Sequence, residues 1–224
     1  MSGSRRAAVA GTFYADTAAG LRGQVEECLP GEPDSVARQP AIAAVCPHAG
    51  LRYSGKTAGA VYGRMAPPDT LVILGPNHHG VGAAAALASH ARWETPLGPV
   101  AIDGELAEAI RAGAPSLAVD NLAHAREHSI EVQLPFVRHL MPAARLVPIS
   151  LGLIGAEAVW EIGRAVAAGV RATGRRAVVV ASTDFSHYVP RPVAEGRDRH
   201  ALEAIGALDP DGLLAAVRRE RITM

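Results

Sequence analysis

The sequence predicts an α/β fold, a three-layer sandwich with a mainly parallel central sheet flanked by helices. Apolar runs at 41–46, 70–74 and 177–181 are rich in alanine and β-branched residues and lack polar alternation, which is typical of strands buried on both faces. Helical spacing of apolar residues between these runs indicates βαβ units. Because 224 residues suit one α/β domain, we expect a single domain over 1–224.

The N-terminal half is expected to begin with an aromatic arm at 10–14 that packs on the domain. Asp16 or Thr17 can then cap a helix, since apolar residues recur every four positions from Leu21 to Leu29. The segments expected next are a loop at 30–40, a strand at 41–46, a helix at 56–65 and a strand at 70–75.

The C-terminal half continues the alternation after a less regular stretch. Strands are expected at 83–89 and 99–102, and Asp103 is expected to cap the helix that follows. Pro135 falls inside an amphipathic helix predicted at 129–140 and should kink it or displace its start. The other predicted segments are a turn at 93–98, a helix ending near 112, an irregular stretch at 114–125, a strand at 145–151, a helix at 155–172, a strand at 177–182, and helices at 193–207 and 209–220.

Composition and charge narrow the environments that suit the chain. The 22 Lys and Arg residues balance the 22 Asp and Glu residues, so no net field favours nucleic acid or an anionic membrane surface. Cys28 and Cys46 are too few for a disulfide framework, and the N-terminus lacks the apolar run of a signal peptide. No segment approaches the roughly 20 apolar residues of a membrane span. We expect a cytoplasmic protein, and abundant alanine, arginine and glycine with scarce lysine indicate a bacterial genome rich in GC.

Histidines follow three of the predicted strands: His48 the first, His78 and His79 the second, and His187 the third. Open α/β sheets bind ligands at the carboxyl ends of their strands, so these side chains are expected to converge. Imidazole is a ligand for Zn, Cu and Fe, which makes His48 and His79 the candidate metal ligands. His78 can instead cap the turn or support its neighbour.

A second polar cluster, Ser-Thr-Asp-Phe-Ser-His at 182–187, ends the third strand. The carboxylate of Asp184 and the imidazole of His187 are three residues apart, which suits a general acid or base oriented by Asp184, or a carboxylate that touches the metal. The alternative is structural, with Asp184 as a cap and His187 on the surface. The catalytic interpretation is favoured because the cluster interrupts an apolar context.

The segment from His124 to His128 has the pattern His-x-x-Glu-His, the spacing of inverted zinc peptidases. This pattern makes a metal-dependent hydrolase the third candidate function, on the condition that 124–131 is helical and that a third ligand lies downstream. Otherwise Glu127 and His128 can line the same cleft at the start of the next helix.

Four ordered motifs give the sequence a resemblance to a known family. They read Pro-His-Ala-Gly-Leu-Arg-Tyr-Ser-Gly at 47–55, Gly-Pro-Asn-His-His at 75–79, Glu-His-Ser-Ile-Glu-Val-Gln-Leu-Pro at 127–135 and Ser-Thr-Asp-Phe-Ser-His-Tyr at 182–188. Together they resemble the Memo family, whose bacterial and archaeal members are called AmmeMemoRadiSam system protein B. That family is similar in fold to class III extradiol ring-cleavage dioxygenases, which agrees with the α/β prediction.

The resemblance implies a divalent metal held by His48 and His79, with Asp184 and His187 beside it. Fe(II) is the expected ion, and Cu and Zn are the alternatives. Family members carry a Cys-Gly pair soon after an Ile-Thr pair, and that cysteine is the third ligand. The sequence stops at 221–224, just short of it. We therefore expect a chain truncated at its C-terminus, in which two imidazoles alone bind the metal weakly.

The function expected first is that of a metal-dependent redox enzyme or oxygenase acting on a small-molecule substrate. The alternative is a non-catalytic binding module for a phosphopeptide or protein partner, with Arg52 and Tyr53 at the mouth of the cleft and Arg52 as an anion clamp. The resemblance also implies a working relationship with a radical SAM protein and an AMMECR-like protein. A homo-oligomer is expected if a second copy covers the edge of the sheet.

Overall fold

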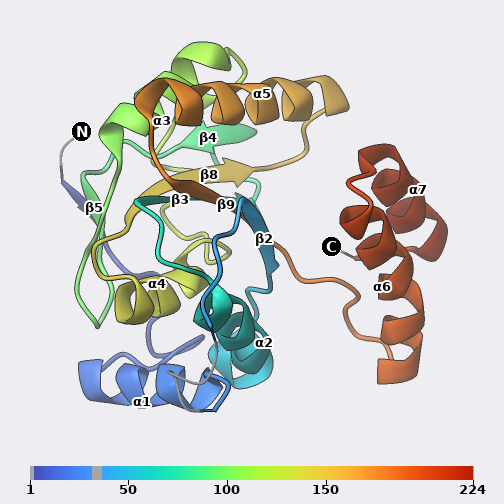
Figure 1. Cartoon of the computed structure of the whole chain (residues 1–224), viewed down its shortest axis with the longest axis horizontal. Helices are drawn as coiled ribbons and strands as arrows, with labels where there is room; N and C mark the ends of the chain where they lie inside the picture. The colour runs from blue at the N-terminus through green and yellow to red at the C-terminus, as the bar shows by residue number, and fades with distance from the viewer. Residues whose placement is uncertain (1–2, 32–36, 224) are drawn as a thin grey trace. The chain divides into compact units, whose positions relative to one another are not determined.

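The computed structural model describes residues 3–31 and 37–223, so residues 32–36 of the loop predicted at 30–40 lie outside the described residues. The chain divides into two compact units, Met1–Ser182 and Thr183–Met224 (Figure 1). The first unit contains the sheet and the second contains two helices. A single domain over 1–224 stays a prediction.

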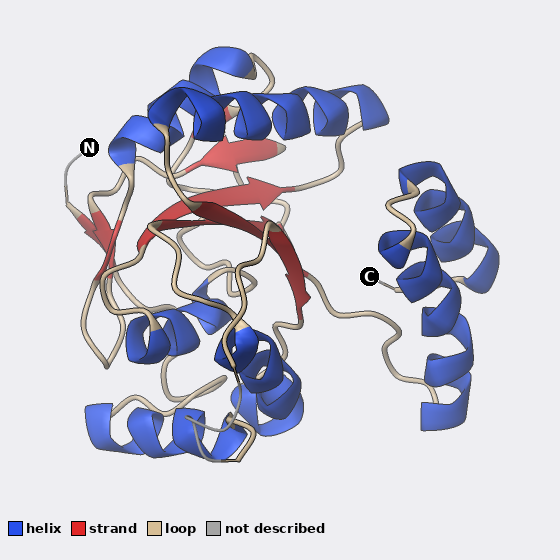
Figure 2. Ribbon diagram, in the orientation of Figure 1, coloured by secondary structure: helices blue, strands red, loops and turns tan. Residues whose placement is uncertain are grey.

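In the described residues of the first unit, the central sheet has six strands (Figure 2). Their order is β2 (Ala43–Cys46), β9 (Ala177–Ser182), β3 (Thr70–Pro76), β8 (Arg145–Leu151), β4 (Ala85–Leu87) and β7 (Ala118–Val119). The β4 strand runs antiparallel to β8, and the other neighbours are parallel. The mainly parallel α/β fold is confirmed.

Strand β3 lies inside the sheet and is buried on both faces. It pairs with β8 on one side and with β9 on the other. Leu71 and Ile73 belong to one core cluster and Val72 to a second, as the alternation of side chains along a strand requires. Because β9 lies between β2 and β3, the three strands that are followed by histidines are neighbours, as predicted.

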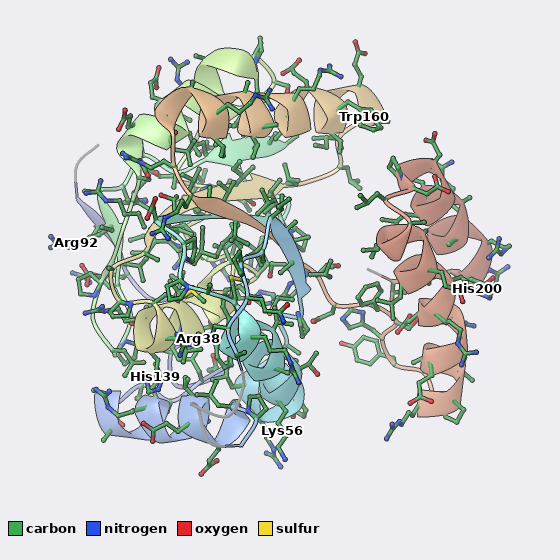
Figure 3. The ribbon with its side chains drawn as sticks, in the orientation of Figure 1. Arg38, Lys56, Arg92, His139, Trp160 and His200 are labelled. Atoms are coloured by element: carbon green, nitrogen blue, oxygen red, sulfur yellow. The ribbon has the colours of Figure 1, made fainter. Side chains whose placement is uncertain are left out.

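Helices cover both faces of this sheet. One face carries α3 (Gly104–Gly113) and α5 (Ala156–Thr173), and the other carries α1 (Ala18–Cys28), α2 (Leu51–Arg64) and α4 (Leu134–Leu140) (Figures 1 and 2). Tyr62 of α2 stacks on Phe136 of α4 with 5.6 Å between ring centroids. Lys56 and Trp160 project from the outer sides of α2 and α5 (Figure 3).

Helix α2 begins at Leu51, five residues before the predicted start at 56. Gly55 and Gly59 lie on the face of this helix that approaches α1. A Cβ at Gly55 would overlap the Cys28 sulfur, and a Cβ at Gly59 would overlap the Cys28 carbonyl oxygen. Close helix packing therefore explains these glycines. Starting at Leu51 also places His48 two residues before the N-cap, Gly50.

The stretch from 83 to 125 differs most from its prediction. The expected turn at 93–98 does not join the two predicted strands. It joins β5 (Arg92–Trp93) to β6 (Val100–Ala101), which form a separate three-stranded sheet with β1 (Ser4–Arg5). The β7 strand lies in the stretch predicted to be irregular. Two-residue strands are too short to show a period in the sequence.

Helices α1 and α3 begin at capping residues that the sequence predicted. The Thr17 hydroxyl accepts the Gly20 amide at the start of α1, and the Asp103 carboxylate accepts the Leu106 amide at the start of α3. Pro135 displaces the start of its helix: a 3₁₀ turn, η2 (Glu131–Gln133), precedes α4, and Pro135 lies in the first turn of α4.

The second unit consists of α6 (Arg191–Gly206), α7 (Pro210–Glu220) and the segment that precedes them. Asp209 caps α7 by accepting the Gly212 amide at 2.9 Å. In the described parts of both units, none of the helices combines the length and the hydropathy of a membrane span.

Candidate metal centre

Three imidazoles converge beyond the carboxyl ends of β2 and β3. His48 follows β2, His78 follows β3, and His128 lies in the loop before η2. One ring nitrogen of each lies within 4.8 Å of the others. The ring centroids are 5.2 Å apart for His48 and His78, and 4.5 Å apart for His78 and His128. This spacing suits one metal ion held by three nitrogen atoms. We call His48, His78 and His128 the histidine trio.

A second group shares one member with the histidine trio. His79, Glu127 and His128 also offer ligand atoms within 4.8 Å of one another. His79 is exposed, and its Nε2 lies 3.1 Å from the Arg126 carbonyl oxygen. A carbonyl oxygen only accepts hydrogen bonds, so Nε2 of His79 carries the hydrogen and Nδ1 keeps the lone pair.

Glu127 is a buried carboxylate that orients His78. Oε2 accepts the His78 backbone amide at 2.7 Å, and Oε1 accepts His78 Nδ1 at 2.9 Å. Oε1 also accepts the backbone amides of His128 and Ser129. Burial alone would raise the pKa of Glu127, but the hydrogen bonds from His78 and Ser129 outweigh it and hold the pKa well below its usual range. The ionised carboxylate fixes the hydrogen of His78 on Nδ1, so the lone pair of the neutral ring lies on Nε2.

Ser182, at the end of β9, fixes the position of the ring hydrogen of His48. Its hydroxyl lies 2.6 Å from the Ser129 carbonyl oxygen and must donate its hydrogen there. The oxygen also accepts Gln133 Nε2 at 2.8 Å. His48 Nδ1, 3.1 Å from Ser182 Oγ, is therefore the donor of their hydrogen bond. This assigns the lone pair of His48 to Nε2, as in His78.

The donor set fits a metal that prefers imidazole. Two of the three rings have a fixed tautomer with Nε2 unprotonated, which is the state that binds metal. A carboxylate that accepts the other nitrogen of a ligating histidine is a recurrent support in metal sites. Three histidines also leave coordination positions open for further ligands. Imidazole is compatible with Fe, Cu and Zn, so the donors do not select among them.

The structure groups the predicted residues differently from the sequence. His48 lies with His78, which the sequence analysis regarded as a supporting residue, and with His128. His79 lies instead in the group with Glu127. The loop after β3 presents two adjacent histidines whose rings have different partners, Glu127 for His78 and the Arg126 carbonyl for His79. Metal ligation by His79 stays a prediction.

Arg52 and Tyr53 lie in the first turn of α2, shortly after His48. Both side chains are exposed, and the Arg52 guanidinium carbon is 6.0 Å from the centroid of the Tyr53 ring. Their role at the mouth of a cleft stays a prediction.

Asp184 and His187 are close to each other in the second unit. Asp184 Oδ2 lies 3.6 Å from His187 Nε2. The other ring nitrogen of His187, Nδ1, lies 3.1 Å from the Thr223 carbonyl oxygen, and the His187 amide donates to the Thr223 hydroxyl at 2.9 Å. The pairing within the cluster at 182–187 is observed, and its catalytic role stays a prediction.

The helix required by the peptidase interpretation is absent from residues 124–130, all of which are described and form turns or irregular backbone. His124 is fully buried, and its Nε2 donates to the Ala86 carbonyl oxygen at 3.1 Å. Its ring packs edge-on against Trp93. Burial lowers the pKa of His124 to about 4. His124 is thus a neutral core residue, and the His-x-x-Glu-His pattern is not an inverted peptidase motif here.

The sequence analysis missed a buried network that holds the loop of His128. Glu131 accepts hydrogen bonds from Arg5 Nη1 at 2.6 Å, from the Tyr14 hydroxyl at 2.6 Å, and from the amides of Ala8 and Val9. Arg5 also donates to the backbone carbonyls of the loop, at His124 and Glu127. The available signal in the sequence was Glu131, a carboxylate that stands between the apolar residues Ile130 and Val132.

The aromatic arm at 10–14 packs on the unit, as predicted, and reaches both loops of the centre. The Phe13 ring lies 4.6 Å from the His128 ring. The Phe13 carbonyl accepts the Leu51 amide at 2.9 Å, next to the His48 turn. One residue of the arm thus contacts the segments that carry His48 and His128.

The family profile and the similar proteins found by comparison all point to one family. The Memo-like protein family profile matches residues 5–224. A MEMO1 family protein of Methanothermobacter thermautotrophicus is 42% identical over 229 residues, covering 98% of this chain and 83% of the relative. MEMO1 family proteins of Methanopyrus kandleri and Caldivirga maquilingensis are 40% and 38% identical, covering 98% and 99% of this chain and 82% of each relative. A bacterial source stays a prediction, since these relatives are archaeal. The chain belongs to the Memo family.

Proposed function

We propose that the protein is a metal-dependent redox enzyme, an oxygenase that acts on a small organic substrate. The observation that carries the proposal is the histidine trio with two Nε2 lone pairs fixed by Glu127 and Ser182. A site with this support is built for a metal ion, because its ligands are held unprotonated and oriented before the ion binds.

The metal is proposed to be Fe(II), with Cu and Zn as alternatives. When bound, a redox-active ion would supply electron transfer between substrate and dioxygen at the open coordination positions. The chain's own residues would orient the ligands and exclude water. Glu127 and Ser182 hold two ligands in place, and the Phe13 ring shields one side of His128 from water.

Two histidines outside the trio are proposed to move protons. His79 has its lone pair on Nδ1 and is exposed, so it can accept a proton from a substrate hydroxyl. His187, 3.6 Å from Asp184, is proposed as a general acid or base of the second unit.

The test is a competitive titration of the chain with Fe(II), Cu(II) and Zn(II), followed by oxygen uptake with phenols and catechols. Ala substitutions of His48, His78 or His128 are expected to weaken metal binding by at least about a hundredfold, since each removes a ligand. His200→Ala, on the exposed side of α6, is the matched control. Oxygen uptake should require the metal and disappear with the trio.

Two outcomes would contradict this proposal. Metal binding that survives His78→Ala but is lost in His79→Ala would place the ion in the second group. Tight phosphopeptide binding that a chelator does not change, without oxygen uptake, would favour a binding module.

A further inference from the structure

A cavity of about 510 Å³ lies beside the histidine trio. His78 and His79 form part of its wall, so one residue of the trio and the exposed His79 both face this space. Cavities that bind small molecules are typically of this size. The other lining residues are Asn77, Gly80, Gly82, Ala83, Ala84, Gly152 and Leu153.

The wall of the cavity consists mainly of small residues, and local backbone geometry explains why they are small. Gly82 has a φ of 81°, and a Cβ there would lie 2.5 Å from Asp120 Oδ2, so only glycine fits. The Gly152 amide donates to the Ala84 carbonyl at 2.6 Å and joins the two sides of the wall. The space is therefore held open by backbone, which does not collapse when the cavity is empty.

The chemistry of the wall disfavours a charged ligand. Among the described residues that line the cavity, none is Lys, Arg, Asp or Glu, and the imidazoles are neutral in their metal-binding state. Behind the wall, the Asp120 carboxylate accepts the Ala83 amide at 2.7 Å and supplies a fixed negative charge. A phosphate or carboxylate would lose its hydration without gaining a cationic partner.

The unused polar atoms of the wall are acceptors. Asn77 Nδ2 donates to the Val81 carbonyl at 2.9 Å, which identifies the other amide atom as oxygen. That oxygen, Oδ1, is buried and has no hydrogen-bond partner among the described residues. His79 presents the lone pair of Nδ1, because its Nε2 donates to the Arg126 carbonyl. Because His79 is exposed, a ligand hydroxyl can reach its Nδ1, whereas the buried Asn77 Oδ1 is shielded from the cavity.

We propose that this cavity binds an uncharged small molecule with hydroxyl donors, of which phenol is the simplest aromatic example. The hydroxyl hydrogen would be donated to His79 Nδ1, while the small wall residues accommodate the ring. This inference rests on the proposed function in that the bound molecule is its substrate.

The test measures ligand binding rather than turnover. Phenol, anisole and phenyl phosphate are titrated into the 224-residue chain, chelator-treated and Zn²⁺-loaded, by isothermal calorimetry and by amide chemical-shift mapping. Phenol is expected to bind at least about tenfold more tightly than anisole, which lacks the donor, and than phenyl phosphate, which is charged. The shifted amides should include Gly80, Gly82 and Gly152.

Filling the cavity provides the matched variant. Ala84 is exposed in the wall, and Ala84→Leu is expected to raise the Kd for phenol at least about tenfold. Ala168→Leu adds the same side chain at an exposed position of α5 and should leave binding unchanged. If Ala84→Leu does not fold, the shift map of the unmodified chain decides the question.

The inference is overturned if phenyl phosphate binds as tightly as phenol, if Ala84→Leu binds phenol normally, or if the shifted amides lie outside the cavity wall. If the chain does not bind phenol but its metal binding depends on the histidine trio as expected, this inference alone is wrong. If phenol binds in the cavity but Ala substitutions in the histidine trio leave the metal affinity unchanged, the proposed function is wrong instead.

Discussion

Ser182 connects the end of β9 to His48, a candidate metal ligand. Its oxygen accepts from Gln133 and donates to the Ser129 carbonyl, which leaves it able only to accept from His48. Nothing in the local sequence marks this serine as different from the others in the cluster at 182–187. Its role depends on β9 pairing next to β2, a property of the topology.

Ser182→Ala should release the tautomer of His48. Without the acceptor, Nδ1 and Nε2 of His48 compete for the hydrogen, and metal affinity is expected to fall by about tenfold to a hundredfold. Imidazole ¹⁵N NMR of the metal-free chain and a competitive titration measure the two effects. Ser182→Thr should restore both, and Ser116→Ala, at an exposed hydroxyl, should change neither. An unchanged His48 spectrum in Ser182→Ala would contradict the assignment.

His124 predicts how stability depends on pH. Its pKa is about 4 in the folded chain and 6.5 ordinarily, because burial disfavours the charged form. Between these values the unfolded chain binds a proton that the folded chain does not, so stability is complete above pH 6.5 and decreases as the pH falls toward 4. At about 1.4 kcal/mol for each pH unit, the loss reaches about 3 kcal/mol.

Urea unfolding at pH 7, 6, 5 and 4 measures this loss. His124→Gln keeps a donor for the Ala86 carbonyl but does not titrate, so its stability should decline less steeply across the same range. The histidines His90 and His139, whose pKa values burial also lowers, add to the slope in both proteins. Equal slopes for the two chains would show that His124 is not responsible.

At the scale of elements, long and strongly patterned segments were predictable and close contacts were not. Strand β8 was predicted at 145–151 and is observed there, since burial on both faces leaves a continuous apolar run. The start of α2 was predicted five residues late, and the approach of its glycines to α1, a helix far away in the sequence, was not predicted. A local pattern cannot distinguish a glycine that turns the chain from one that admits another helix.

Two glycines of α2 give a matched test of this packing. Gly59→Ala would place a Cβ against the Cys28 carbonyl of α1, and overpacking of this kind typically costs about 1–3 kcal/mol. Gly63→Ala makes ordinary contacts with Pro30 and Leu29, the nearest to Pro30 Cδ at 3.5 Å, and should be stabilising by up to about 1 kcal/mol because alanine favours the helix. Urea unfolding of both variants decides this, and equal effects would refute the packing argument.

At the scale of the whole molecule, the residue types of the site were predictable but their grouping was not. The sequence analysis placed His48 and His79 together because parallel strands end at one edge. It did not predict that His78 lies beside His48, because that placement depends on the contact of the loop with Glu127, which comes from a segment 49 residues away. His128 was assigned only to the cleft, since no strand delivers it.

The Arg5–Glu131 pair near the site joins two residues that are 126 positions apart in the sequence. Both side chains are buried, so Arg5→Met alone or Glu131→Leu alone should cost about 3–5 kcal/mol by leaving a buried charge without its partner. Arg5→Met should also weaken metal binding, since Arg5 holds the carbonyl of Glu127 in the ligand loop.

Replacing both partners separates a simple ion pair from a network. A buried pair is often replaced by apolar residues at little cost. Here the Arg5→Met, Glu131→Leu double variant should not recover stability, because the Tyr14 hydroxyl and the amides of Ala8 and Val9 lose their acceptor. The measurement is a double-mutant cycle from urea unfolding, with a zinc titration of each variant. A double variant as stable as the unmodified chain would mean that the arm is held by its apolar contacts, such as Phe13 on His128, and that Glu131 serves only to neutralise Arg5.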